Sequence, residues 1–203
     1  MRKDWLVFVT SCPRREPTLQ RTVESLARAG WPDVSVTFDA ERRGSLTNFV
    51  RALRLATLKP SQRILIAQDD VQFAPNLRDH LDAIPNWPTG VVSLWLPMSH
   101  QPTGNKWWQL NEGDLPRKAY GALAYVLGFG LACEIQGHAL AKPELPPNKT
   151  DLFVGRFCKQ YGVPYWYPSR SYCQHIGRTS TISEGVAWNT KARQAGPDWD
   201  SPL

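Results

Sequence analysis

Short apolar runs alternate with amphipathic segments through the first half of the chain. The apolar runs have the length of strands, and the segments between them carry apolar residues at helical spacing. Strands that alternate with helices of this length are typical of βαβ units in a mostly parallel sheet. The predicted strands are 5–10, 34–38, 64–67 and 91–96, and the predicted helices run from Thr18 to Gly30, from Ser45 through Leu53 and from Pro75 to Ile84.

The second half has a less regular pattern. A polar stretch at 98–117 predicts a long surface loop or hairpin, and the chain ends in a polar tail that starts at Gly185. Between them we expect a strand at 120–127, a helix at 150–161 and a strand at 163–167. No internal repeat or linker interrupts the pattern, so the sequence predicts a single α/β domain over its whole length.

Polar residues stand at the ends of three predicted strands. Thr10 ends the first strand, Asp39 follows the second, and Asp69 and Asp70 follow the third. Ligands of open α/β sheets bind at the carboxyl ends of the strands. We therefore expect these four side chains to lie along one edge of the sheet and to form the functional site.

The adjacent carboxylates of Asp69 and Asp70 are the sharpest chemical signal. Two like charges directly after an apolar strand repel each other unless a positive group offsets them. Mg²⁺ or Mn²⁺ bound to a diphosphate is a natural partner, because these ions take one or two carboxylates together with phosphate oxygens. His175, just past a late strand, is a candidate for a further ligand. The alternatives are a solvated turn that caps the helix near Pro75, and a structural role for the histidine.

The composition favours an anionic partner. The net charge is +6, and nine tryptophans could either stack on sugars and bases or pack in the core. The four cysteines form no CxxC pair, so we expect reduced thiols. The sequence has neither an apolar run long enough to span a membrane nor a secretory signal, so we expect a cytoplasmic protein without a transmembrane segment.

In their order along the chain, these motifs resemble those of GT-A glycosyltransferases. That family has a Thr/Ser loop after the first strand, an acid after the second and a DxD-type motif after a later strand. An apolar Gly-x-x-x-Tyr segment, an Asp that opens a late helix and a C-terminal His follow. The matching residues are Val9-Thr10-Ser11, Asp39, Gln68-Asp69-Asp70, Gly121 to Tyr125, Asp151, and Pro168-Ser169 with Gln174-His175-Ile176-Gly177. Gln68 stands where the family usually has its first acid.

The resemblance implies a single GT-A (Rossmann-like) domain with a mostly parallel central sheet flanked by helices. Residues 1–96 would form the nucleotide-sugar-binding half, 97–180 the acceptor-binding and catalytic half, and 181–203 a tail. Such an enzyme moves a sugar from a nucleotide-diphosphate donor, here a UDP-sugar, to an acceptor hydroxyl with the help of Mn²⁺ or Mg²⁺.

The resemblance also assigns roles to single residues. Asp70 and His175 would hold the metal. Asp151 would be the general base opposite the metal, as in an inverting enzyme, although a first-turn acid that stabilises the helix dipole is the alternative. The donor would be bound by Thr10, Arg14, Asp39, Asp69, Arg178 and Ser180.

Two other functions stay open. The charge and the arginine pairs, such as Arg42-Arg43, favour a non-catalytic nucleic-acid-binding module, but such a module has no use for paired acids. A nucleotidyltransferase also needs carboxylates, a metal and a nucleotide, although Ser11-Cys12-Pro13 is not a Gly-rich phosphate loop. For a glycosyltransferase, the acceptor is either a saccharide or lipid-linked glycan, or a hydroxymethylated base in DNA.

Overall fold

The computed structural model describes residues 4–13, 17–97, 107–116, 119, 123–142 and 149–177. Its strands are β1 (Trp5–Ser11), β2 (Ser35–Phe38), β3 (Arg63–Gln68), β4 (Val71–Phe73), β5 (Val91–Ser93), β6 (Trp108–Gln109), β7 (Ala124–Leu127), β8 (Tyr165–Tyr167) and β9 (Cys173–His175). Its helices are α1 (Thr18–Arg28), α2 (Ser45–Ala56), α3 (Leu77–Ala83), α4 (Phe129–Leu140) and α5 (Thr150–Tyr161), with the 3-10 turn η1 (Glu112–Asp114).

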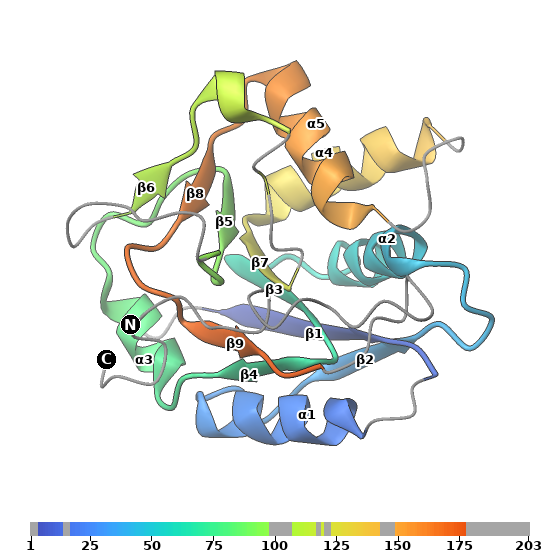
Figure 1. Cartoon of the computed structure of the whole chain (residues 1–203), viewed down its shortest axis with the longest axis vertical. Coiled ribbons are helices and arrows are strands. Elements are labelled where there is room, and N and C mark those ends of the chain that lie inside the picture. Colours follow the sequence, from blue (N-terminus) through green and yellow to red (C-terminus); the bar gives the residue numbers. More distant parts are fainter. Residues whose placement is uncertain are drawn as a thin grey trace.

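The strands form one central sheet and one small ribbon. The central sheet has the order β2-β1-β3-β7-β5-β8-β6, and β4 pairs with β9 in the ribbon (Figure 1). In the central sheet β1, β2, β3, β5 and β8 run in one direction, and β7 and β6 run in the other. The predicted α/β class and mostly parallel sheet are therefore confirmed.

Helices and the ribbon cover the two faces of the sheet. α2, α4 and α5 pack together on one face, and α1 and the β4–β9 ribbon lie on the other (Figure 1). The side chains of β3 alternate between these layers, with Ile64 and Ile66 in the α2 core and Leu65 and Ala67 in the α1 core. Because β3 is covered on both sides, it reads as an unbroken apolar run in the sequence.

Local geometry explains where the structure departs from the predicted elements. No helix is predicted at 129–140, yet α4 begins directly after Gly128. β5 ends at Ser93 rather than at residue 96, since the Ser93 hydroxyl bonds to the backbone of Trp95 and turns the chain. The β4–β9 ribbon is also not predicted, because three-residue strands carry too few positions for a periodic pattern.

Some predicted segments are covered only in part. Within the predicted loop or hairpin at 98–117, the described residues 107–116 hold β6 and η1. The polar tail that starts at Gly185 lies outside the described residues.

Gly90 provides a test of how β5 lies against β8. Its φ is 118°, and a Cβ placed there would lie 2.2 Å from the carbonyl oxygen of Pro164. We expect Gly90→Ala to lower the free energy of unfolding by about 3 kcal/mol. The matched control is Gly113→Ala, whose Cβ would meet nothing within 4 Å and should change stability by less than about 0.5 kcal/mol. Urea unfolding followed by tryptophan fluorescence measures both, and equal midpoints would contradict this strand contact.

Candidate active site

The carboxyl ends of three parallel strands meet at one edge of the sheet. Thr10 of β1 is aligned with Gln68 of β3, and Ser11 is aligned with Phe38 of β2. The residues that follow these strands therefore lie at the same level. This register brings Asp39, Asp69 and Asp70 to one edge, as the sequence predicts.

Both carboxylates of the acid pair are buried. Asp69 is 2% exposed and Asp70 is 4% exposed. The Ser11 hydroxyl donates a hydrogen bond to Asp69 Oδ2 at 2.6 Å. His175 Nε2 lies 2.9 Å from Asp70 Oδ2, within hydrogen-bond and ion-pair distance. The two adjacent acids therefore have partners on different strands: Asp69 is bound by Ser11 of β1, and Asp70 by His175 of β9.

The ribbon holds His175 in place. Val71 of β4 is aligned with His175 of β9, and the Ile176 N–H donates to the backbone carbonyl of Asp70 at 2.8 Å. The chain after β9 then passes directly over the acid, because a Cβ at Gly177 would lie 2.7 Å from Asp70 Oδ2 and 3.2 Å from His175 Nε2. A side chain at position 177 would fill the space above both groups.

The Asp39 carboxylate is hydrogen-bonded to the loop that follows it in the chain. Its two carboxylate oxygens accept the backbone N–H groups of Arg43 and Gly44, at 3.0 and 2.9 Å, and it is only 9% exposed. Arg42 and Gly44 have positive φ values of 53° and 111°, which turn these N–H groups back toward the carboxylate. Asp39 thus fixes the loop that leads into α2.

Asp151 lies in the first turn of α5, close to the start of α2. The Thr150 hydroxyl donates to Ser45 Oγ at 3.1 Å, and the Leu152 N–H donates to Asp151 Oδ1 at 2.8 Å. Burial raises the pKa of Asp151 above its ordinary value, although the Leu152 N–H and the charge of Lys149 act in the other direction. A half-buried acid with a raised pKa at the open edge of a sheet has the chemistry of a proton acceptor.

Of the other residues predicted to bind the sugar donor, the structure describes only Thr10. The Thr10 hydroxyl donates to the carbonyl of Ala67 at 3.2 Å, so it ties β1 to β3. Arg14, Arg178 and Ser180 lie outside the described residues.

No protein-family model and no curated protein matches this sequence. None of the described helices has the length and apolar character needed to cross a bilayer.

Solved structures do match. A197 from STIV aligns over 94% of this chain and 93% of its own, with a TM-score of 0.53 and 12% identity. A protein described as a glucose-1-phosphate thymidylyltransferase from Bacillus anthracis, solved with sucrose, aligns over 93% of this chain and 95% of its own, with a TM-score of 0.51 and 13% identity. The fold is of the GT-A type. A Drosophila β-1,4-galactosyltransferase 7, solved with manganese, UDP-Gal and xylobiose, aligns over 93% of this chain and 80% of its own, with a TM-score of 0.49 and 13% identity.

Two polar residues at this edge of the sheet, Ser11 and Asn48, are not among the predicted site residues. Ser11 holds Asp69, and its backbone carbonyl accepts a hydrogen bond from Asn48 Nδ2 at 2.9 Å. Asn48 also donates to the carbonyl of Thr37 at 3.0 Å, so one amide joins β1, β2 and α2. For Asn48 the sequence does carry a signal, because it is a polar residue on the otherwise apolar face of the predicted helix, between Leu46 and Phe49.

The raised pKa of Asp151 makes a prediction about stability. A carboxyl whose pKa is higher in the folded state contributes stability at low pH, and that contribution is lost as the pH rises through the raised value. Asp151→Asn should therefore be at least as stable as the natural chain at neutral pH, and its advantage should shrink as the pH falls toward 3.8. Thermal unfolding over this pH range measures the difference. A variant that is less stable at neutral pH and gains stability relative to the natural chain on acidification would contradict the burial of this charge.

Proposed function

We propose that this protein is a metal-dependent glycosyltransferase that uses a nucleotide-diphosphate sugar. The observation that carries the proposal is the buried acid pair, Asp69 and Asp70, with His175 brought against Asp70 from a strand far along the chain. A fold of the GT-A type supplies the setting, and the acids lie at the sheet edge where such folds bind ligands.

The residues fit Mn²⁺ or Mg²⁺. Asp70 and His175 provide a carboxylate and an imidazole, and their atoms are 2.9 Å apart. Two ligands at about 2.1 Å from one octahedral ion lie about 3 Å apart. Among the described residues, no group of three or more His, Cys, Asp or Glu side chains could hold a metal alone. Diphosphate oxygens are therefore suited to complete the coordination, as is usual for Mg²⁺ sites.

Asp151 would accept the proton of the acceptor hydroxyl. Its raised pKa improves it as a base near neutral pH, and the start of α5 sets its position beside the start of α2. A bound Mn²⁺ or Mg²⁺ would act as the Lewis acid that stabilises the departing diphosphate. Asp70 and His175 would hold the metal on the opposite side of the site from Asp151. A base opposite the metal suits inversion at the anomeric carbon of the sugar.

The donor would lie along the ends of β1, β2 and β3. Thr10, Asp39 and Asp69 come from those three strand ends, and we assign them to the nucleotide and sugar of a UDP-sugar. Arg14, Arg178 and Ser180 would bind the nucleotide and the diphosphate. The acceptor would carry a hydroxyl group, on a saccharide or lipid-linked glycan or on a hydroxymethylated base in DNA.

A nucleotidyltransferase is the second candidate. The likeness of fold to the protein described as a thymidylyltransferase, at a TM-score of 0.51, is the observation that favours it. A panel of nucleotide sugars, and of nucleoside triphosphates with sugar 1-phosphates, separates the two. Release of a nucleoside diphosphate from a nucleotide sugar supports the glycosyltransferase, and release of pyrophosphate supports the alternative.

Metal dependence is the first test of the site. Excess EDTA should abolish release of the nucleoside diphosphate, and Mn²⁺ or Mg²⁺ should restore it. Metal assistance is worth several kcal/mol, so Asp70→Asn should lower the rate by about a thousandfold. His175→Ala should raise the metal concentration needed for the half-maximal rate. Full turnover in EDTA would exclude this assignment.

The role of Asp151 is tested by pH and by substitution. Activity should fall as the pH drops through its raised pKa, which lies above the ordinary 3.8 for an aspartate. Asp151→Asn should lower kcat by at least about a hundredfold, with little change in the KM for the donor. The control is Asp33→Asn, an exposed acid that precedes β2 at the other end of the sheet. If Asp151→Asn keeps its activity, Asp151 acts only on the helix dipole.

A further inference from the structure

The first residues of two helices meet at the open edge of the sheet. Ser45 begins α2 and Thr150 begins α5, and the Thr150 hydroxyl donates to Ser45 Oγ at 3.1 Å. Because Thr150 is only 4% exposed, its hydroxyl depends on this partner rather than on water. Asp151, the proposed base, is the next residue of α5. The bond to Ser45 therefore acts on the backbone that carries the Asp151 carboxylate.

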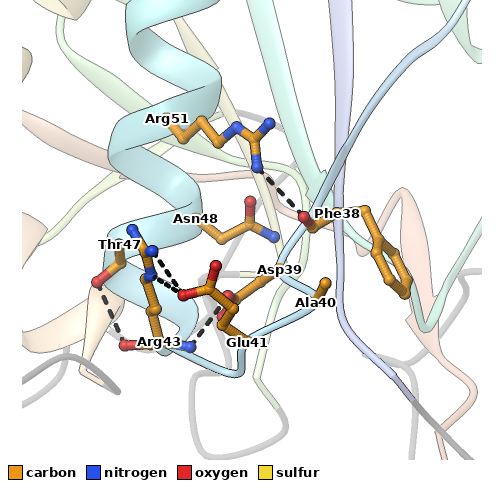
Figure 2. A pocket seen from close by; sticks show the side chains of 8 residues that line it. All are labelled: Phe38, Asp39, Ala40, Glu41, Arg43, Thr47, Asn48 and Arg51. Carbon is orange, nitrogen blue, oxygen red and sulfur yellow. Dashed lines mark hydrogen bonds and ion pairs between the residues drawn. The ribbon is translucent and has the colours of Figure 1, made fainter.

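The same turn of α2 is bonded to the central sheet. Ser45 and Asn48 are neighbours on the helix surface, since they lie within one helical turn. Asn48 extends from α2 toward the end of β2 (Figure 2), and its amide donates to the carbonyl of Ser11 at 2.9 Å. The Ser11 hydroxyl in turn donates to Asp69. The first turn of α2 thus connects the acid pair, through Ser11, to the residue that precedes Asp151.

The loop before α2 fixes the position of Ser45. The Asp39 carboxylate accepts the backbone N–H groups of Arg43 and Gly44, and the Thr47 hydroxyl donates to the Arg43 carbonyl at 3.3 Å (Figure 2). These bonds tie the start of α2 to the end of β2. Ser45 therefore offers α5 an acceptor whose place relative to the strand ends is set.

The start of α5 has fewer directional contacts. No side chain within the described residues caps this helix. Phe153 and Phe157 pack in the same core as the apolar face of α2, but apolar contacts hold a helix against its neighbour without fixing its position along its axis. A hydrogen bond depends on distance and angle. The bond from Thr150 to Ser45 is therefore suited to set where the first turn of α5 lies.

We propose that Ser45 is a positioning residue that holds Asp151 in place for proton transfer. This role rests on the proposed function, in which Asp151 is the base. Without the Ser45 hydroxyl the carboxylate is still present, but the first turn of α5 can shift. A misplacement of about 1 Å can lower a rate about a hundredfold. The metal and donor residues belong to other elements, so binding of the donor should not change.

The experiment measures release of the nucleoside diphosphate from the nucleotide sugar that the donor panel identifies, with Mn²⁺ or Mg²⁺ present. Ser45→Ala should lower kcat by about tenfold to a hundredfold. The KM for the donor and the metal concentration for the half-maximal rate should stay within about twofold of those of the natural chain. Ser45→Thr keeps a hydroxyl oxygen at this position and should retain most of the activity.

Thr150→Val tests whether the two hydroxyls act through each other. Valine has nearly the shape of threonine but cannot donate to Ser45. If one hydrogen bond carries the effect, Ser45→Ala combined with Thr150→Val should lower kcat no more than the more damaging single change. Losses that multiply in the double variant would mean that the two hydroxyls act independently, and would overturn the proposal.

The matched control is Thr57→Val at the other end of α2. The Thr57 hydroxyl donates to Gln136 Oε1 of α4 at 2.6 Å, so this change also removes a side-chain bond from α2 to a neighbouring helix. Both Ser45→Ala and Thr57→Val should lower the thermal midpoint by about 2–4 °C, yet only Ser45→Ala should lower kcat. Equal losses of kcat, or a rise in donor KM in Ser45→Ala, would make the Ser45 bond purely structural and overturn the proposal.

The outcomes separate this role from the proposed function. If the natural chain releases no nucleoside diphosphate from any donor, or if Asp151→Asn keeps full turnover, the proposed function fails and the role of Ser45 fails with it. If the natural chain turns over and depends on Asp151, while Ser45→Ala keeps its kcat, only the role of Ser45 is overturned.

Discussion

The burial of two adjacent carboxylates is the constraint on which the rest of the site depends. A buried charge that lacks partners destabilises a protein by several kcal/mol, so each acid needs its own partner. Neighbouring residues after a strand point in different directions, and Asp69 and Asp70 are met by Ser11 of β1 and His175 of β9. The second partner comes from far along the chain. The β4–β9 ribbon, with the Ile176 N–H on the Asp70 carbonyl, therefore ties the late part of the chain to the site.

Features with a strong local pattern could be predicted from the sequence. β3 is covered on both faces and reads as an apolar run, and α5 shows one buried face with an acid in its first turn. The motif order also led to the GT-A type of fold, which the solved structures confirm. α4 was not predicted, because its glycines, Gly130 and Gly137, weaken the helical pattern of the sequence. Contacts with α2 and α5 stabilise this helix, although its local propensity does not favour one.

The chemistry of single residues could be predicted less well, because it depends on contacts across the sheet. Asp39 stands at the predicted strand end, but both of its oxygens accept backbone N–H groups of the following loop. Only the positive φ values of Arg42 and Gly44 bring those groups within reach. Asn48 shows the reverse case, since its position on a helix gives no hint that it joins two strands. In both cases the loop and helix geometry decides which atoms are left to meet a ligand.

The distribution of charge links the acid pair to the surface around it. A diphosphate or a nucleic-acid strand is negative, and buried carboxylates alone would repel either one. In the proposed arrangement, a cation held by Asp70 and His175 offsets the charge of these acids. The chain as a whole has a net charge of +6, so its long-range field attracts polyanions, while the acids act only at short range. A basic surface that attracts polyanions and the proposed site for a metal-bound diphosphate are therefore compatible in one small α/β fold.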